Sequence, residues 1–265
     1  MKKIGFIGAG NMATAIIKGL LAQNDNEKNI FVFDVSEQQL NNVCALGVTP
    51  CSSGSEVVEQ CDIIVLAVKP QHYAEVLEGV KQSVTPQKTF VSIAAGISIA
   101  YVQSALECDC PVMRVMPNTP LLLKKGASAL CPSENMGEED RDIIYNMFAG
   151  SGVCAYFTED HMNEIIAVNG SSPAYIYLFA KAMADYAQSQ GIDYDSAMQL
   201  ICATLEGSAA MLRESGDTPD ELIAKVSSKG GTTIAALEKL REHGFYEAIL
   251  EAMDACTKRA EELGK

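Results

Sequence analysis

The sequence predicts an α/β domain with a mostly parallel sheet, followed by an all-helical domain. Three observations lead to this fold class. Over residues 1–158, short apolar runs of strand length alternate with segments of helical periodicity, and a glycine-rich turn follows the first run. From residue 159 to residue 265, helical periodicity continues without a convincing strand. Strands that alternate with helices across short turns indicate a parallel sheet, and the change of pattern predicts a domain boundary between residues 158 and 159.

The first strand, turn and helix carry a dinucleotide-binding motif. The apolar run at residues 4–7 ends in Gly8-Ala9-Gly10-Asn11-Met12-Ala13, which fits G-x-G-x-x-G/A, and a second apolar run follows at residues 30–33. Gly8 permits a tight turn, and Gly10 lets the backbone approach a pyrophosphate. Asn11 and Met12 open a helix whose free N–H groups face the phosphates. The motif alone is often only a loop, but this context predicts a Rossmann-type domain that binds NADH or NADPH.

Asp34, at the end of the second strand, bears on the choice of cofactor. A carboxylate there accepts hydrogen bonds from both ribose hydroxyls, whereas a 2′-phosphate would meet like charge. No Arg or Lys follows in Val35-Ser36-Glu37-Gln38. We therefore expect NADH to be favoured over NADPH. The alternative is that Asp34 caps the next helix, a role that Ser36 could also fill.

The alternation continues through four more predicted strands. A helix is expected after Asp34, through Leu40 and Val43, and further helices near residues 55–60, 72–84 and 138–148. Strands are expected at residues 62–68, 89–93, 111–115 and 152–157. Loops at the carboxyl ends of parallel strands bind ligands in open α/β sheets. The expected cofactor contacts in these loops are Ala67, Val68, Lys69, Pro70, Ala94, Ala95, Gly96 and Asn118.

Each of these loops also has a plainer interpretation. Lys69 could be a solvated loop lysine, and Ala94-Ala95-Gly96 could be a tight turn rather than room for a nicotinamide ring. Asn118, between two prolines in Met116-Pro117-Asn118-Thr119-Pro120, could hold its own loop together. Arg114 is expected to be structural.

In the helical half, a helix beginning near Pro173 is apolar on most sides, with Tyr175-Ile176-Tyr177-Leu178-Phe179 in succession. Such a helix must be buried on all sides, which a small helical domain alone hardly achieves, so we expect a subunit interface. Further helices are expected at residues 195–213, 219–226, 232–242 and 246–263.

Two turns interrupt this half. One is Asn169-Gly170-Ser171-Ser172-Pro173, and the other is Ser227-Ser228-Lys229-Gly230-Gly231-Thr232-Thr233. In the second turn, glycines permit close backbone approach, and the following helix presents N–H groups beside two threonine hydroxyls, an arrangement that can hold a carboxylate. The alternative is N-capping by Ser or Thr.

Composition limits the partners. The formal net charge of −14 argues against nucleic acid and against an anionic membrane surface, because both would be repelled. The nine cysteines have no metal-binding spacing and no C-x-x-C. Neither a signal segment nor an apolar run of about 18 residues is present, so we expect reduced thiols, a cytoplasmic location and no metal site.

The chain resembles the pyrroline-5-carboxylate reductase family along its whole length. Besides the opening motif, the resemblance rests on Ala67-Val68-Lys69-Pro70, Ser92-Ile93-Ala94-Ala95-Gly96, Met116-Pro117-Asn118-Thr119-Pro120, Gly170-Ser171-Ser172-Pro173-Ala174-Tyr175 and Val226-Ser227-Ser228 with Gly230-Gly231-Thr232-Thr233-Ile234. It implies reduction of (S)-1-pyrroline-5-carboxylate to L-proline with NAD(P)H, the last step of proline synthesis. It also implies a helical domain that forms a homodimer or a ring of dimers.

The resemblance also implies site roles. The turn that contains Ser228, Gly230, Gly231, Thr232 and Thr233 would hold the substrate carboxylate, and the three loops named above would line the cofactor. Asn169 stands where the family usually has serine, with little effect expected. Asp34 stands where many relatives have an Asn-Arg-Ser type of pocket, which puts strict NADPH use in doubt.

The motifs contain no His or carboxylate as an obvious acid, so Thr233 is the candidate to orient the imine nitrogen or relay a proton. Two rival functions remain. A β-hydroxyacid dehydrogenase or other imine reductase would need a catalytic lysine, for which Lys181 is the only candidate and lacks the usual setting. A redox sensor would bind NADH without turnover.

Overall fold

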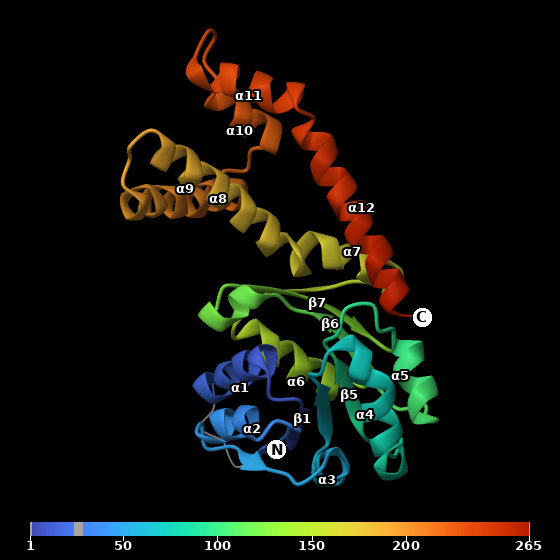
Figure 1. Cartoon of the computed structure of the whole chain (residues 1–265). Helices are drawn as coiled ribbons and strands as arrows, with labels where there is room; N and C mark the ends of the chain where they lie inside the picture. Colours follow the sequence, from blue (N-terminus) through green and yellow to red (C-terminus); the bar gives the residue numbers. More distant parts are fainter. Residues whose placement is uncertain (1, 24–28, 265) are drawn as a thin grey trace. The chain divides into compact units, whose positions relative to one another are not determined.

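The computed structural model describes residues 2–23 and 29–264 (Figure 1). It divides into two compact units. One consists of Met1–Ser171 with Asp254–Lys265, and the other of Ser172–Met253. Met1 and Lys265, the outer limits of the two predicted domains, lie outside the described residues.

The first unit contains an eight-stranded sheet in the order β3-β2-β1-β4-β5-β6-β7-β8. All neighbouring strands are parallel except β6 and β7, which are antiparallel. The strands are β1 (Ile4–Ile7), β2 (Ile30–Phe33), β3 (Thr49–Pro50), β4 (Ile63–Leu66), β5 (Thr89–Ser92), β6 (Val112–Met116), β7 (Gly126–Pro132) and β8 (Gly152–Tyr156). The predicted Rossmann-type, mostly parallel sheet is confirmed.

Helices cover both faces of this sheet (Figure 1). On one face, α1 (Asn11–Gln23), α2 (Glu37–Cys44) and α6 (Glu138–Ala149) share a core with Phe6 and Val65. On the other, α3 (Gly54–Gln60), α4 (Tyr73–Val80) and α5 (Ile99–Leu106) share a core with Ile7 and Leu66. Successive strand residues point to opposite faces, so a strand covered on both sides must be apolar throughout. This explains the continuous apolar run of β4, all four residues of which are inaccessible to solvent.

Short 3-10 turns lie between or beside several of these elements. They are η2 (Pro70–His72), η3 (Lys81–Ser83), η4 (Thr119–Leu123) and η5 (Glu159–His161). The helix expected at residues 72–84 is therefore α4 flanked by η2 and η3. Strands β3 and β7 and helix α5 were not among the expected elements.

The segment after β8 belongs to the first unit. It consists of η5, α7 (Met162–Ile165) and the π-helical η6 (Ile166–Gly170), and Met162 of α7 is buried against Ala129 and Cys131 of β7. The change between compact units consequently falls after Ser171, later than the boundary expected after residue 158, which stays a prediction about the functional division of the chain.

The second unit is helical. It contains α8 (Ser172–Ser189), α9 (Tyr194–Glu214), α10 (Pro219–Lys225), α11 (Thr232–Glu242) and the first part of α12 (Phe245–Leu263). Helices α8 and α9 pack through small residues, among them Ala180, Ala184 and Ala197. Other apolar side chains stay exposed, including Leu178 at 69% and Leu200 at 72%. Within the described part of the chain, no helix combines the length and apolarity that crossing a bilayer requires.

Candidate active site

The glycine turn between β1 and α1 has the geometry of a phosphate-binding turn. Gly8 has a φ of +104°, and a Cβ at this position would lie 2.6 Å from the carbonyl oxygen of Ala67. A Cβ on Gly10 would meet no heavy atom within 4 Å, so the backbone there borders open space. Helix α1 begins immediately afterwards, at Asn11. Open space at a helix N-terminus suits an anion such as a pyrophosphate.

Asp34 anchors this turn to the end of β2. Its Oδ2 accepts a hydrogen bond from the backbone N–H of Ala9 at 2.6 Å, and its Oδ1 accepts one from the N–H of Ser36 at 2.7 Å. Ser36 is the N-cap of α2, so Asp34 is not the capping residue. A carboxylate offers about four acceptor positions, so about two of them remain for hydrogen bonds from a ligand.

A cavity of about 420 Å³ lies beside these two features. Its lining includes Gly8, Asp34, Val35, His72 and Glu75, with further residues from α3 and α4. None of the described residues that line it is Lys or Arg. Neither His72 nor Glu75 was among the expected cofactor contacts. Their position three and six residues after Lys69, in the segment that follows a strand end, was the available signal.

The loop after β5 packs against the end of α12 (Phe245–Leu263). Gly96 has a φ of +81°, and a Cβ there would overlap the carbonyl oxygen of Ala260, near the end of α12. Ala94 and Gly96 are buried. The small residues of this loop are therefore needed for packing, besides the expected room for a nicotinamide ring. Lys69, in the neighbouring loop after β4, is exposed.

Asn118 holds the loop after β6 in place. Its Oδ1 accepts from the N–H of Ala127 at 2.9 Å, and its Nδ2 donates to the carbonyl of Asn169 at 3.2 Å. Asn169 donates in turn to the carbonyls of Met116 and Ala127, at 2.8 and 3.0 Å. Position 169 thus has more contacts than the sequence suggested, because an amide can bridge two segments that a serine hydroxyl is too short to join.

Arg114 is structural, as expected. It is 3% exposed, and its Nη1 lies 2.9 Å from Oε1 of Glu159. Its Nη2 donates to Oδ1 of Asn163 at 2.6 Å. The same Glu159 oxygen accepts from the N–H of Ile99, so this network joins β6, α5 and η5.

The candidate substrate turn belongs to the second unit. Gly230 has a φ of +75°, and the N–H of Gly231 donates to the carbonyl of Ser228 at 2.9 Å. Gly231 is the N-cap of α11, without a side-chain hydrogen bond to the first turn. The alternative role of N-capping by Ser or Thr is therefore absent from the described turn. A Cβ on Gly231 would lie 2.9 Å from the backbone carbonyl oxygen of Ser228, which leaves little room for a larger residue.

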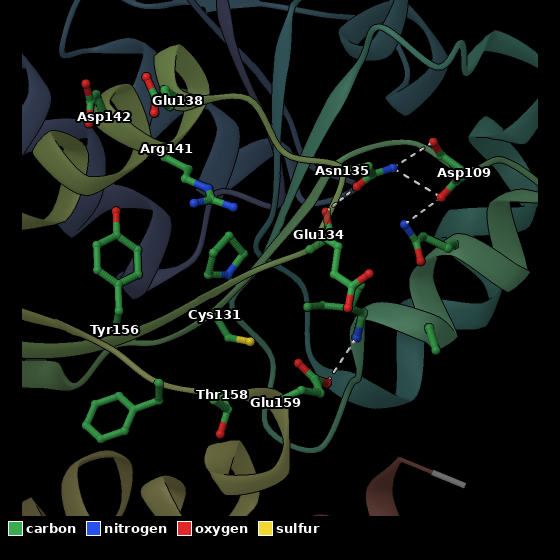
Figure 2. A pocket seen from close by; sticks show the side chains of 16 residues that line it. Asp109, Cys131, Glu134, Asn135, Glu138, Arg141, Asp142, Tyr156, Thr158 and Glu159 are labelled. Atoms are coloured by element: carbon green, nitrogen blue, oxygen red, sulfur yellow. Dashed lines mark hydrogen bonds between the residues drawn. The ribbon is translucent and has the colours of Figure 1, made fainter.

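A second cavity, of about 1090 Å³, lies elsewhere (Figure 2). It is at the carboxyl ends of β7 and β8, and because β7 runs antiparallel to β6, this is the edge opposite the glycine turn. Figure 2 shows Arg141 facing a lining that includes Asp109, Glu134 and Glu159. Five carboxylates and a single arginine line this cavity, and such an acidic lining does not suit an anionic dinucleotide.

All the predicted cofactor contacts follow the carboxyl ends of parallel strands. They are Gly8, Gly10, Asn11 and Met12 after β1, Asp34 after β2, Ala67, Val68, Lys69 and Pro70 after β4, Ala94, Ala95 and Gly96 after β5, and Asn118 after β6. Lys181, the candidate lysine of a rival enzyme class, is exposed in α8 and paired with Asp185, whose hydrogen bond and charge raise the pKa of the ammonium. Lys181 is therefore a solvent-exposed, ion-paired residue, and the sequence around it lacks the usual setting of a catalytic lysine. The fold and site define a Rossmann-type, NAD(P)-dependent oxidoreductase.

Comparisons with known proteins identify the family. Residues 3–96 match the model described as NADP oxidoreductase, coenzyme F420-dependent, and residues 159–263 match pyrroline-5-carboxylate reductase dimerisation. The chain is 38% identical to the pyrroline-5-carboxylate reductase of Escherichia coli (strain K12), over 100% of this chain and 99% of that one. It is 36% identical to the Corynebacterium melassecola enzyme of the same name, over the full length of both.

A solved structure agrees with the sequence matches. Plasmodium falciparum pyrroline carboxylate reductase with NADP bound is 28% identical, with a TM-score of 0.92 over 100% of this chain and 98% of that one. The chain belongs to the pyrroline-5-carboxylate reductase family.

Proposed function

We propose that this chain transfers a hydride from NAD(P)H to the imine carbon of (S)-1-pyrroline-5-carboxylate and so forms L-proline, the last step of proline synthesis. The observation that carries the proposal is the N-terminus of α11, where Gly231 caps the helix without a side-chain hydrogen bond. The first-turn N–H groups are thus left for a ligand carboxylate. In a chain with a net charge of −14, an anionic substrate needs such a local site.

The described residues fit a dinucleotide. Gly10 borders open space at the start of α1, and Asp34 retains two acceptor positions beside a cavity. We assign the pyrophosphate to the backbone of Gly8, Gly10, Asn11 and Met12, and the adenosine ribose to Asp34. The loops Ala67–Pro70 and Ala94–Gly96, with Asn118, are assigned to the nicotinamide half. Bound there, the cofactor supplies the hydride.

NADH is the proposed preference. A 2′-phosphate in the cavity would face the carboxylates of Asp34 and Glu75, and the described lining offers no Lys or Arg to offset them. Two unit charges about 5 Å apart at an effective dielectric constant of about 40 repel by about 1.5 kcal/mol, which is roughly tenfold in affinity. The phosphate carries more than one charge, but solvent screening at this open site reduces the effect.

The substrate contacts are assigned to Ser228, Gly230, Gly231, Thr232 and Thr233. Reduction of the imine consumes one hydride and one proton, and the amine nitrogen receives the proton. Thr233 is the proposed residue for orienting that nitrogen or relaying a proton from water. It is half-buried at the start of α11.

The working form is proposed to be a homodimer or a ring of dimers. Tyr177 and Leu178 in α8 are 61% and 69% exposed, and Leu200 in α9 is 72% exposed. Apolar side chains of this number on one helical unit indicate a surface that a second copy covers. All nine cysteines are free thiols, which supports a cytoplasmic location for the enzyme.

The test follows the loss of cofactor absorbance while purified protein meets pyrroline-5-carboxylate, with NADH and NADPH in parallel and proline measured as product. Turnover that favours NADH supports both the reaction and the role of Asp34. Turnover that favours NADPH keeps the reaction and refutes the cofactor preference. Binding of NADH without turnover on any cyclic imino acid would support the redox-sensor function instead.

A further inference from the structure

A buried tyrosine lies beneath two of the proposed cofactor loops. Tyr73 is the first residue of α4, and its side chain is completely buried in the core shared by α3, α4 and α5. No role was assigned to it above. A tyrosine in a dry core keeps its hydroxyl only where that hydroxyl finds a partner, because an unpaired buried polar group is destabilising.

The hydroxyl of Tyr73 joins the last residues of two neighbouring strands. It donates to the carbonyl oxygen of Leu66, the last residue of β4, at 2.8 Å. It lies 3.1 Å from Oγ of Ser92, the last residue of β5. A phenol has one proton, so Ser92 must be the donor in the second bond. Burial raises the pKa of Tyr73, which keeps that proton in place.

These two strand ends are the points where the cofactor loops leave the sheet. Leu66 and Ser92 are register partners across β4 and β5. Ala67 follows Leu66, and its carbonyl oxygen is the atom that a Cβ on Gly8 would meet at 2.6 Å. A shift of the Leu66 carbonyl would therefore reach the phosphate-binding turn. Ala94 follows Ser92 by two residues, at the start of the loop assigned to nicotinamide.

We propose that Tyr73 is a positioning residue for the nicotinamide half of the cofactor: its hydroxyl fixes the spacing between the loops Ala67–Pro70 and Ala94–Gly96. This inference rests on the proposed function, because it needs those loops to hold NAD(P)H. Tyr73 is too deeply buried to touch the substrate. It acts through Leu66 and Ser92, and hydride transfer is sensitive to displacements of the order of 1 Å.

The test is Tyr73→Phe, which keeps the packing and removes one oxygen. Dissociation constants for NADH come from the fluorescence of the bound cofactor, and 5′-AMP is measured as a competitor that occupies only the adenosine half. Loss of one hydrogen bond corresponds to about 3- to 10-fold. We expect NADH affinity and kcat/KM to fall by this factor with either cofactor, while the inhibition constant of 5′-AMP changes less than twofold.

Two further variants keep the result interpretable. Tyr101→Phe removes a hydroxyl from a half-buried tyrosine of α5 in the same core and should leave NADH binding unchanged. Ser92→Ala should reproduce the effect of Tyr73→Phe. The double variant should lose no more NADH affinity than either single variant, because all three break the hydrogen bond between Tyr73 and Ser92.

If Tyr73→Phe weakened the affinities for NADH and for 5′-AMP equally, the variant would be generally destabilised and the proposal would be overturned. Unchanged NADH binding and turnover in a folded variant would overturn it as well. Failure of the proposed function has a different signature. In that case the wild-type protein would bind NADH and leave pyrroline-5-carboxylate untouched, while the comparison of NADH with 5′-AMP would still report on Tyr73.

Discussion

Replacement of Asp34 separates its structural role in holding the glycine turn from its proposed role in selecting the cofactor. In Asp34→Asn the side chain keeps its size but offers one oxygen, so it can accept from Ala9 or from Ser36 and not from both. The other N–H then faces an NH₂ group. A hydrogen bond to a charged group contributes about 1.5–3 kcal/mol. Asp34 is half-buried, so we expect a loss at the lower end, about 1–2 kcal/mol.

Thermal unfolding measures the first role. For a chain of this size, about 1 kcal/mol corresponds to about 2–4 °C, so the expected fall in Tm is about 2–8 °C. Asp34→Ser removes both acceptor oxygens of the carboxylate and should lower Tm by at least as much. A matched control is Asp62→Asn, since that exposed carboxylate also accepts a backbone N–H, from Lys3, away from the proposed site.

Kinetics measure the second role. Both Asp34 variants remove a negative charge from the cavity, so the ratio of kcat/KM for NADPH to that for NADH should rise about tenfold, while Asp62→Asn leaves it unchanged. A ratio that stays constant in Asp34→Asn and Asp34→Ser would refute the electrostatic argument. A Tm equal to that of the wild type in both variants would refute the structural one.

Three other outcomes follow from the structure. Gly96→Ala should lower the free energy of unfolding by about 2 kcal/mol or more in denaturant titrations, because the φ of Gly96 is +81° and a Cβ there would overlap the carbonyl oxygen of Ala260. The control is Gly79→Ala, since a Cβ at that position meets nothing within 4 Å. Its free energy of unfolding should stay within about 1 kcal/mol of the wild-type value. Arg114→Met should cost about 2–3 kcal/mol in the same titration, because Glu159, whose side chain is 35% exposed, loses its cationic partner. A loss below about 1 kcal/mol would contradict the structural role. Thr233→Val should reduce kcat at least about tenfold and leave the dissociation constant of NADH unchanged, and intact turnover would exclude Thr233 from proton delivery.

Much of the first unit was predictable because its signals are local. The strands β1, β2 and β4 are short apolar runs, and in β1 and β4 burial on both faces requires that composition. The turn at Gly8 was recognisable since only a few residues separate strand, glycines and helix. Strand β7 was missed because Gly126-Ala127-Ser128-Ala129 has little β propensity. It is a strand because it pairs with β6 on one side and β8 on the other.

Other parts of the site depended on contacts that no local pattern contains. The sequence indicated that Asp34 ends a strand near the glycine turn, but not that its carboxylate already binds Ala9 and Ser36. It indicated small residues at Ala94 to Gly96, but not that the end of α12 packs against Gly96. The sequence placed Tyr73 in a helix, and only the structure shows that its hydroxyl lies between the ends of β4 and β5.

By itself, the sequence determined the fold class, the glycine turn and the acidic residue that follows β2, because hydrophobic periodicity and backbone requirements act over a few neighbouring residues. Its motifs also predicted the family that the comparisons identify. Only the tertiary structure decided which polar groups already have partners, which glycines face another backbone and which cavity lies beside Asp34. Those properties arise where segments distant in the chain come within a few ångströms, and there packing and hydrogen-bond geometry decide which side chains remain available to a ligand.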